Sequence, residues 1–152
     1  AHMPRATLEG YDISPQSIQI ANAVAKAAGV DGRASYLEKD ALDLEKIEAE
    51  SADACICSFL VEHLEDPQHL YKVLSHLLKP GGTAFITGAL TAAQVDHIYE
   101  YKYESELVTM CENAGLRVLE TLSANPMRTL PKAKFMPRSM ALLVQKRVND
   151  IY

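Results

Sequence analysis

Apolar residues occur in short runs along the chain, separated by turn-forming residues. In residues 52–58, Ala54, Cys55, Ile56 and Cys57 form a short, largely apolar run. Continuous runs of this kind are typical of parallel strands that are buried on both faces. We expect strands at 6–12, 33–38, 52–58, 83–88, 116–121 and 140–146.

Between these predicted strands, apolar residues recur at the spacing of a helix. The pairs Ser14-Pro15 and Asp66-Pro67 each place a capping side chain before proline, which predicts that a helix begins there. A further helix is expected over residues 104–114. The alternation of strand and helix predicts an α/β fold with an open, mostly parallel sheet.

Composition agrees with a soluble globular protein. The chain has 152 residues, of which 48% are hydrophobic and 23% are charged, a size that suits one domain over residues 4–152. Residues 1–3 resemble an expression scar, which we exclude from the fold.

The same composition narrows the expected partners and compartment. No apolar run approaches the ~20 residues of a membrane-spanning helix, so we expect no membrane partner. A net charge of −5 disfavours nucleic acid as a partner, because binding to phosphates needs a basic face. Three cysteines do not form an even disulfide set, which favours a reducing, cytoplasmic location.

Four short segments, taken in order, resemble the class I S-adenosylmethionine-dependent methyltransferases. These are GYDISP at 10–15, KDA at 39–41, CSFLVEHL at 57–64 and LLKPGG at 77–82. The resemblance runs from near the family's second strand to its last strand. It implies a shortened Rossmann-like sheet with an antiparallel strand at residues 140–146, and a small-molecule methyl acceptor.

The resemblance also implies a set of residues that bind S-adenosylmethionine. Asp12 would accept hydrogen bonds from the ribose hydroxyls and Ile13 would cover the adenine. Asp40 would accept a hydrogen bond from the adenine amine, and the small side chain of Ala41 would leave space for the base. Ser58 would face the methyl donor. The positions suit this role, because open α/β sheets bind ligands beyond the carboxyl ends of their strands. The alternative is that Asp12 belongs to a capping turn and Asp40 to a solvated edge.

The segment that follows residue 58 is the expected place of the chemistry. Glu62 or His63 would take a proton from the acceptor, and histidine titrates near neutral pH. The alternative for His63 is a structural hydrogen bond. No metal site is expected, because His63, His69 and His76 lack a compact ligand spacing and no carboxylate completes a set.

Aromatic residues are the expected wall of the acceptor pocket. Phe59 lies in the active-site turn of the resemblance. Tyr99, Tyr101 and Tyr103 alternate, so in an extended segment they share a face. The alternative is that these tyrosines pack on the sheet with their hydroxyls in water.

The family's glycine-rich turn is missing, since the chain contains no G-x-G-x-G run. Only glycine lets the backbone approach the methionine part of the cofactor, so we expect weak or no cofactor binding by this chain alone. Two hypotheses remain open. The chain is an incomplete methyltransferase whose sheet a second copy or a partner chain completes, or it is a non-catalytic methyltransferase-like binding or regulatory module.

Overall fold

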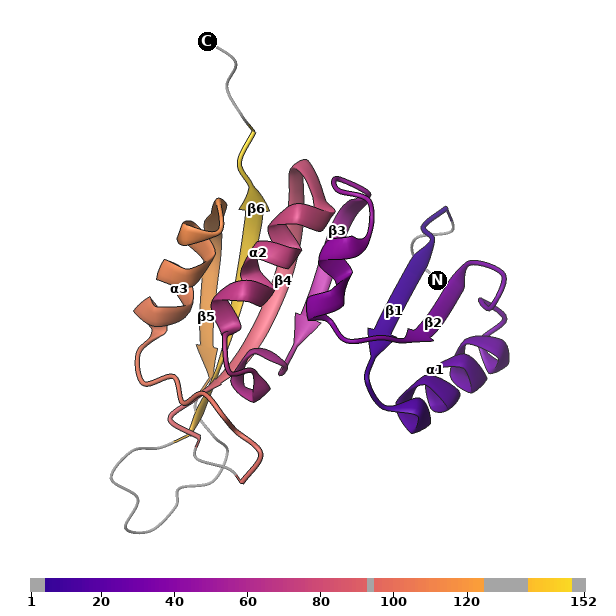
Figure 1. Cartoon of the computed structure of the whole chain (residues 1–152), viewed down its shortest axis with the longest axis horizontal. Coiled ribbons are helices and arrows are strands. Elements are labelled where there is room, and N and C mark those ends of the chain that lie inside the picture. The colour runs from indigo at the N-terminus through magenta and orange to yellow at the C-terminus, as the bar shows by residue number, and fades with distance from the viewer. Residues whose placement is uncertain (1–4, 93–94, 125–136, 149–152) are drawn as a thin grey trace. The chain divides into compact units, whose positions relative to one another are not determined.

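The structure is a computed structural model that describes residues 5–92, 95–124 and 137–148. The chain divides into two compact units, Ala1–Lys46 and Ile47–Tyr152 (Figure 1). The expected scar at residues 1–3 and most of the proline-containing segment between the last two strands lie outside the described residues. No helix in the described ranges is long and apolar enough to span a membrane.

The first unit is a strand–helix–strand motif that ends in a short 3₁₀ helix. Strand β1 (Leu8–Asp12) pairs in parallel with β2 (Ala34–Glu38), and α1 (Pro15–Ala27) connects them before the 3₁₀ turn Leu42–Lys46. Helix α1 begins where the sequence predicts, because the Ser14 hydroxyl accepts from the backbone N–H of Ser17 at 3.2 Å. The parallel pairing places the carboxyl ends of β1 and β2 next to each other.

The second unit is a four-stranded sheet in the order β3-β4-β6-β5. Its strands are β3 (Ala52–Ser58), β4 (Leu78–Leu90), β5 (Leu116–Ala124) and β6 (Arg138–Lys146). Strands β3 and β4 are parallel, whereas β6 lies between β4 and β5 and is antiparallel to both. The fold is thus the α/β, Rossmann-like sheet with an antiparallel last strand that the resemblance implies.

Strand β4 starts five residues earlier than the sequence predicts. Residues 79–82, which precede the predicted strand, lie within β4 as an irregularity, where the register passes from Ala52 opposite Leu78 to Ala54 opposite Thr83. Gly82 is required there, because a Cβ atom on it would lie 2.9 Å from the carbonyl oxygen of Lys79. The Pro-Gly-Gly sequence therefore makes a bulge in β4 rather than a separate turn.

Helices α2 (Pro67–Leu77) and α3 (Glu104–Asn113) cover one face of this sheet (Figure 1). Leu70, Val73 and Leu74 of α2 are buried, at the spacing of an apolar stripe along one face of a helix. The sheet contributes buried side chains from alternate positions of its two central strands, namely Ala84, Ile86, Leu90, Met140, Leu142 and Val144. The core of the second unit therefore lies between these helices and the sheet.

Candidate functional site

A tight turn leaves the carboxyl end of β3 and begins the candidate site. Phe59 has a φ of +49°, a left-handed conformation that non-glycine residues rarely adopt. The turn is fastened to β4, since the Phe59 N–H donates to the Thr87 carbonyl at 3.1 Å and the Ser58 and Thr87 hydroxyls lie 2.9 Å apart. A short 3₁₀ helix, Val61–His63, follows at once. Strain held in this way is common where a chain positions functional groups.

Glu62 is a buried carboxylate in this 3₁₀ helix. Its side chain is 1% exposed, and its Oε2 atom has no hydrogen-bond partner in the described part of the chain. Its backbone carbonyl accepts from the N–H groups of Ile98 and Tyr99 at 2.9 and 3.0 Å. These two bonds hold the segment before α3 against the start of the site.

Two histidines lie next to this carboxylate, and each is oriented by a backbone carbonyl. The His63 Nδ1 atom lies 2.8 Å from the Asp96 carbonyl oxygen, and the His97 Nδ1 atom lies 2.6 Å from that of Ala92. A carbonyl oxygen only accepts, so each Nδ1 carries a hydrogen and each neutral ring keeps an Nε2 lone pair. The rings stand at 86° to each other with centroids 5.0 Å apart.

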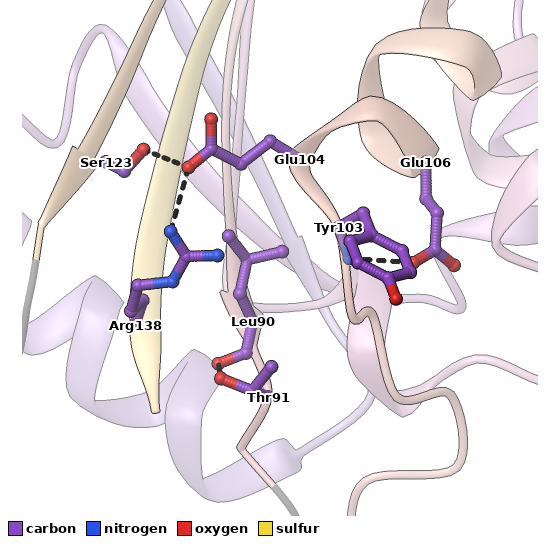
Figure 2. Close-up of polar contacts among 7 residues, drawn as sticks. All are labelled: Leu90, Thr91, Tyr103, Glu104, Glu106, Ser123 and Arg138. Atoms are coloured by element: carbon purple, nitrogen blue, oxygen red, sulfur yellow. Dashed lines mark hydrogen bonds and ion pairs between the residues drawn. The ribbon is translucent and has the colours of Figure 1, made fainter. Parts of the chain in front are cut away.

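These side chains line a cavity of about 390 Å³ in the second unit. Arg138, at the start of β6, also lines it. The Glu104 carboxylate holds Arg138 in place by an ion pair of 3.1 Å and also accepts from the Ser123 hydroxyl (Figure 2). Side chains of α3, β5 and β6 therefore meet beside Arg138, one residue of the cavity lining. Its lining comprises Phe59, Glu62, His63, Ala89, Ala92, Asp96, His97, Ala124, Pro137, Arg138 and Ser139.

The structure brings only some of the sequence-predicted residues to this cavity. Phe59, Glu62 and His63 line it, whereas Tyr99 and Tyr101 do not. Tyr101 is fully buried and its hydroxyl points to the sulfur of Met110 at 3.8 Å, so it does not form part of the wall of this cavity. The alternation of these tyrosines reflects packing, with the rings of Tyr99 and Tyr101 4.7 Å apart.

His97 and Arg138 are cavity residues that the sequence did not indicate. His97 lies in an irregular segment and Arg138 opens a strand far along the chain, so neither belongs to a local motif. The expectation of no metal cluster considered only His63, His69 and His76. In the structure His97, rather than either of the latter two, lies beside His63.

The first unit carries four of the five residues predicted to bind the cofactor, and the fifth, Ser58, ends β3 in the second unit. Asp12 ends β1 and Asp40 follows β2, and both side chains are exposed. One oxygen of each already closes a local turn: Asp12 Oδ1 accepts from the Ser14 N–H at 2.8 Å, and Asp40 Oδ1 accepts from the Leu42 N–H at 2.9 Å. One oxygen of Asp12 thus takes part in the turn before α1, as the capping alternative predicts, and each exposed carboxylate keeps further acceptor capacity for hydroxyl or amine donors.

Comparison with known proteins agrees with the fold and the motifs. A family model described as a methyltransferase domain matches residues 1–86. The chain is 29% identical over 143 residues to a ubiquinone biosynthesis O-methyltransferase of Paracidovorax citrulli, covering 80% of this chain and 60% of that protein. The corresponding protein of Xanthomonas axonopodis is 26% identical over 132 residues, with 74% and 54% covered. The chain thus spans little more than half the length of these relatives.

Solved structures share the fold at low sequence identity. The cyclase SpnF superposes with a TM-score of 0.80 at 16% identity, covering 94% of this chain and 67% of that one. A geranyl diphosphate methyltransferase in complex with S-adenosylmethionine superposes with a TM-score of 0.77 at 12% identity, covering 95% and 71%. Because the family model covers more than half of the sequence and the motifs occur in the family's order, the chain belongs to the class I S-adenosylmethionine-dependent methyltransferases.

Proposed function

We propose that the chain forms part of an enzyme that methylates a hydroxyl oxygen of a small molecule. The observation that carries the proposal is the cavity beyond β3, where Glu62 and His63 face the same space as the ring of Phe59. Its volume of about 390 Å³ suits a small acceptor rather than a polymer. The O-methyltransferase names of the curated relatives support oxygen as the methylated atom.

Two side chains are suited to take the acceptor's proton. The Nε2 atom of His63 is a proton acceptor because its Nδ1 atom is held by the Asp96 carbonyl. The buried carboxylate of Glu62 is the second candidate. Bound S-adenosylmethionine would supply a sulfonium methyl group, whose carbon–sulfur bond breaks as the bond to the acceptor oxygen forms. Phe59, which is 49% exposed, offers an apolar surface to the acceptor.

Within the first unit, Asp12 and Asp40 are the proposed nucleoside ligands. Their exposed carboxylates suit the ribose hydroxyls and the adenine amine, with Ile13 and Ala41 next to them in the sequence. That Ser58 faces the methyl donor stays a prediction from the resemblance. The sequence has no G-x-G-x-G turn to approach the methionine part. We therefore expect calorimetry to give a dissociation constant above the micromolar range for S-adenosylmethionine. A dissociation constant in the micromolar range or below would contradict the expected weak cofactor binding.

The transfer reaction is tested by mass spectrometry at saturating S-adenosylmethionine, with catechol as the acceptor probe. The saturating concentration compensates for the weak cofactor binding expected above, so a small amount of methylated product above the protein-free blank is expected. It should fall with His63→Gln and Glu62→Gln but persist with Glu65→Gln, a matched change at an exposed neighbouring carboxylate. Absence of product in the wild type would favour the alternative, a non-catalytic binding or regulatory module. The missing glycine-rich turn is the observation that supports this alternative.

A further inference from the structure

Glu62, His63 and His97 form a cluster with the composition of a metal site. Each offers one ligand atom, and these atoms all lie within 4.8 Å of one another. Ligands bound at about 2.0–2.2 Å to a single ion are at most about 4.4 Å apart, so small side-chain rotations would close the set. The hydrogen bonds from Ile98 and Tyr99 to the Glu62 carbonyl hold the two contributing segments together.

The buried carboxylate is independent evidence that a ligand belongs here. Glu62 is 99% buried, and its Oε2 atom has no partner among the described residues. A carboxylate removed from water without a hydrogen bond or a counter-ion is strongly unfavourable, and such groups call for an explanation. A cation bound by Glu62 would supply both the missing charge and the missing contact.

The histidines are already oriented as metal-binding imidazoles are. Each ring donates its Nδ1 hydrogen to a backbone carbonyl, that of Asp96 for His63 and that of Ala92 for His97. Such an outer contact fixes the tautomer and leaves the Nε2 lone pair for an ion. Two imidazoles of this kind beside a buried carboxylate are hard to explain as separate structural features.

We propose that Glu62, His63 and His97 bind one divalent transition cation of the Zn²⁺ type. Two nitrogen ligands and one carboxylate favour Zn²⁺ and similar ions, whereas Mg²⁺ and Ca²⁺ prefer oxygen ligands alone. Three protein ligands leave a coordination position open toward the cavity that all three residues line. With the ion bound, Glu62 and His63 are ligands, so their proposed role as proton acceptors belongs to the metal-free protein.

The test is calorimetric titration of the chelator-treated full chain with ZnCl₂, alongside MgCl₂. Binding of one Zn²⁺ ion per chain, with little or no Mg²⁺ binding, is expected. His97→Ala and Glu62→Gln should each weaken Zn²⁺ binding by about tenfold or more. The matched controls His69→Ala and Glu65→Gln change the same residue types outside the cluster and should leave the affinity as it is.

A second measurement covers the case in which Glu62→Gln does not fold. Zn²⁺ should raise the unfolding temperature of the wild type but not that of His97→Gln, whose side chain is only half-buried. The Co²⁺ absorption spectrum should lack a thiolate charge-transfer band, because no cysteine belongs to the set. Absence of Zn²⁺ binding, unchanged binding in His97→Ala, or a thiolate band would each overturn the proposal. None of these measurements depends on methyl transfer.

Discussion

Gly88 leaves the space in which a methyl group of Val61, the residue before Glu62, lies. A Cβ atom at position 88 would be 3.8 Å from Glu62 Oε2 and only 2.9 Å from a methyl group of Val61. The absence of a side chain on β4 therefore allows the 3₁₀ helix to pack closely and to bury its acidic residue. The shape of the site depends on a strand that contributes no functional group at this position.

Replacing Gly88 by alanine should therefore disturb both packing and site. The added methyl group would also meet Leu107 at 3.3 Å, so we expect a loss of about 1–3 kcal/mol in the free energy of unfolding. Chemical denaturation measures the loss. Gly32→Ala is the control, because nothing lies within 4 Å and its φ is not positive, so that change should be neutral or slightly stabilising. Equal effects of the two changes would contradict the packing argument.

Two substitutions at Asp12 distinguish its hydrogen bond in the turn before α1 from its proposed role in binding the nucleoside. Asp12→Ala removes the acceptor for the Ser14 N–H, at a cost of about 0.5–1.5 kcal/mol, whereas Asp12→Asn keeps that acceptor. We expect both variants to fold and both to lose adenosine binding as measured by NMR titration. Asp31→Asn, an exposed change in the same unit, should retain it. Severe unfolding of Asp12→Ala would instead assign the residue a purely structural role.

The cysteines should be unreactive in the folded protein. Burial raises the pKa of Cys55 to about 11 and is the main cause that raises the pKa of Cys57 and of Cys111 to about 12, from an ordinary value of 9.0. At pH 8 all three remain thiols, so a disulfide reagent should label them slowly until the protein is denatured. Rapid labelling of Cys57 in the native state would contradict its burial.

The same pKa shifts predict a loss of stability in alkali. The folded protein favours the protonated thiols, so their contribution to the free energy of unfolding is fully present below pH 9. This contribution is lost as the pH rises toward about 12. The unfolding temperature measured from pH 8 upward should fall over this window. Cys57→Ala should make the fall shallower, while an unchanged profile would show that other groups cause it.

An apolar row crosses the sheet face opposite α2 and α3. Ile56, Phe85 and Leu143 lie on neighbouring strands in direct register and are 77%, 44% and 36% exposed. The double change Ile56→Thr/Phe85→Thr should lower the fluorescence of a bound hydrophobic dye and alter stability little. Val95→Thr, at a single fully exposed position, is the control. Undiminished dye binding would show that the dye binds elsewhere.

Local chemistry made most of the elements predictable. Ser14 and Asp66 each accept a backbone N–H from three residues further on, so the helix starts could be placed from the sequence. The apolar runs likewise located the strands. The start of β4 was misplaced because Pro-Gly-Gly, a common turn sequence, here forms an irregularity that depends on pairing with β3.

The sequence by itself determined the elements, the family and the adjacent pair Glu62 and His63, because capping, periodicity and short motifs act between neighbours in the chain. Only the tertiary structure decided that Tyr101 is buried and that His97 lies beside His63. Asp96, which orients His63, is 33 positions away, and the segment is held by backbone hydrogen bonds to Glu62 that any residue type can make. Contacts of that kind have no sequence pattern, since they arise only when distant segments pack together.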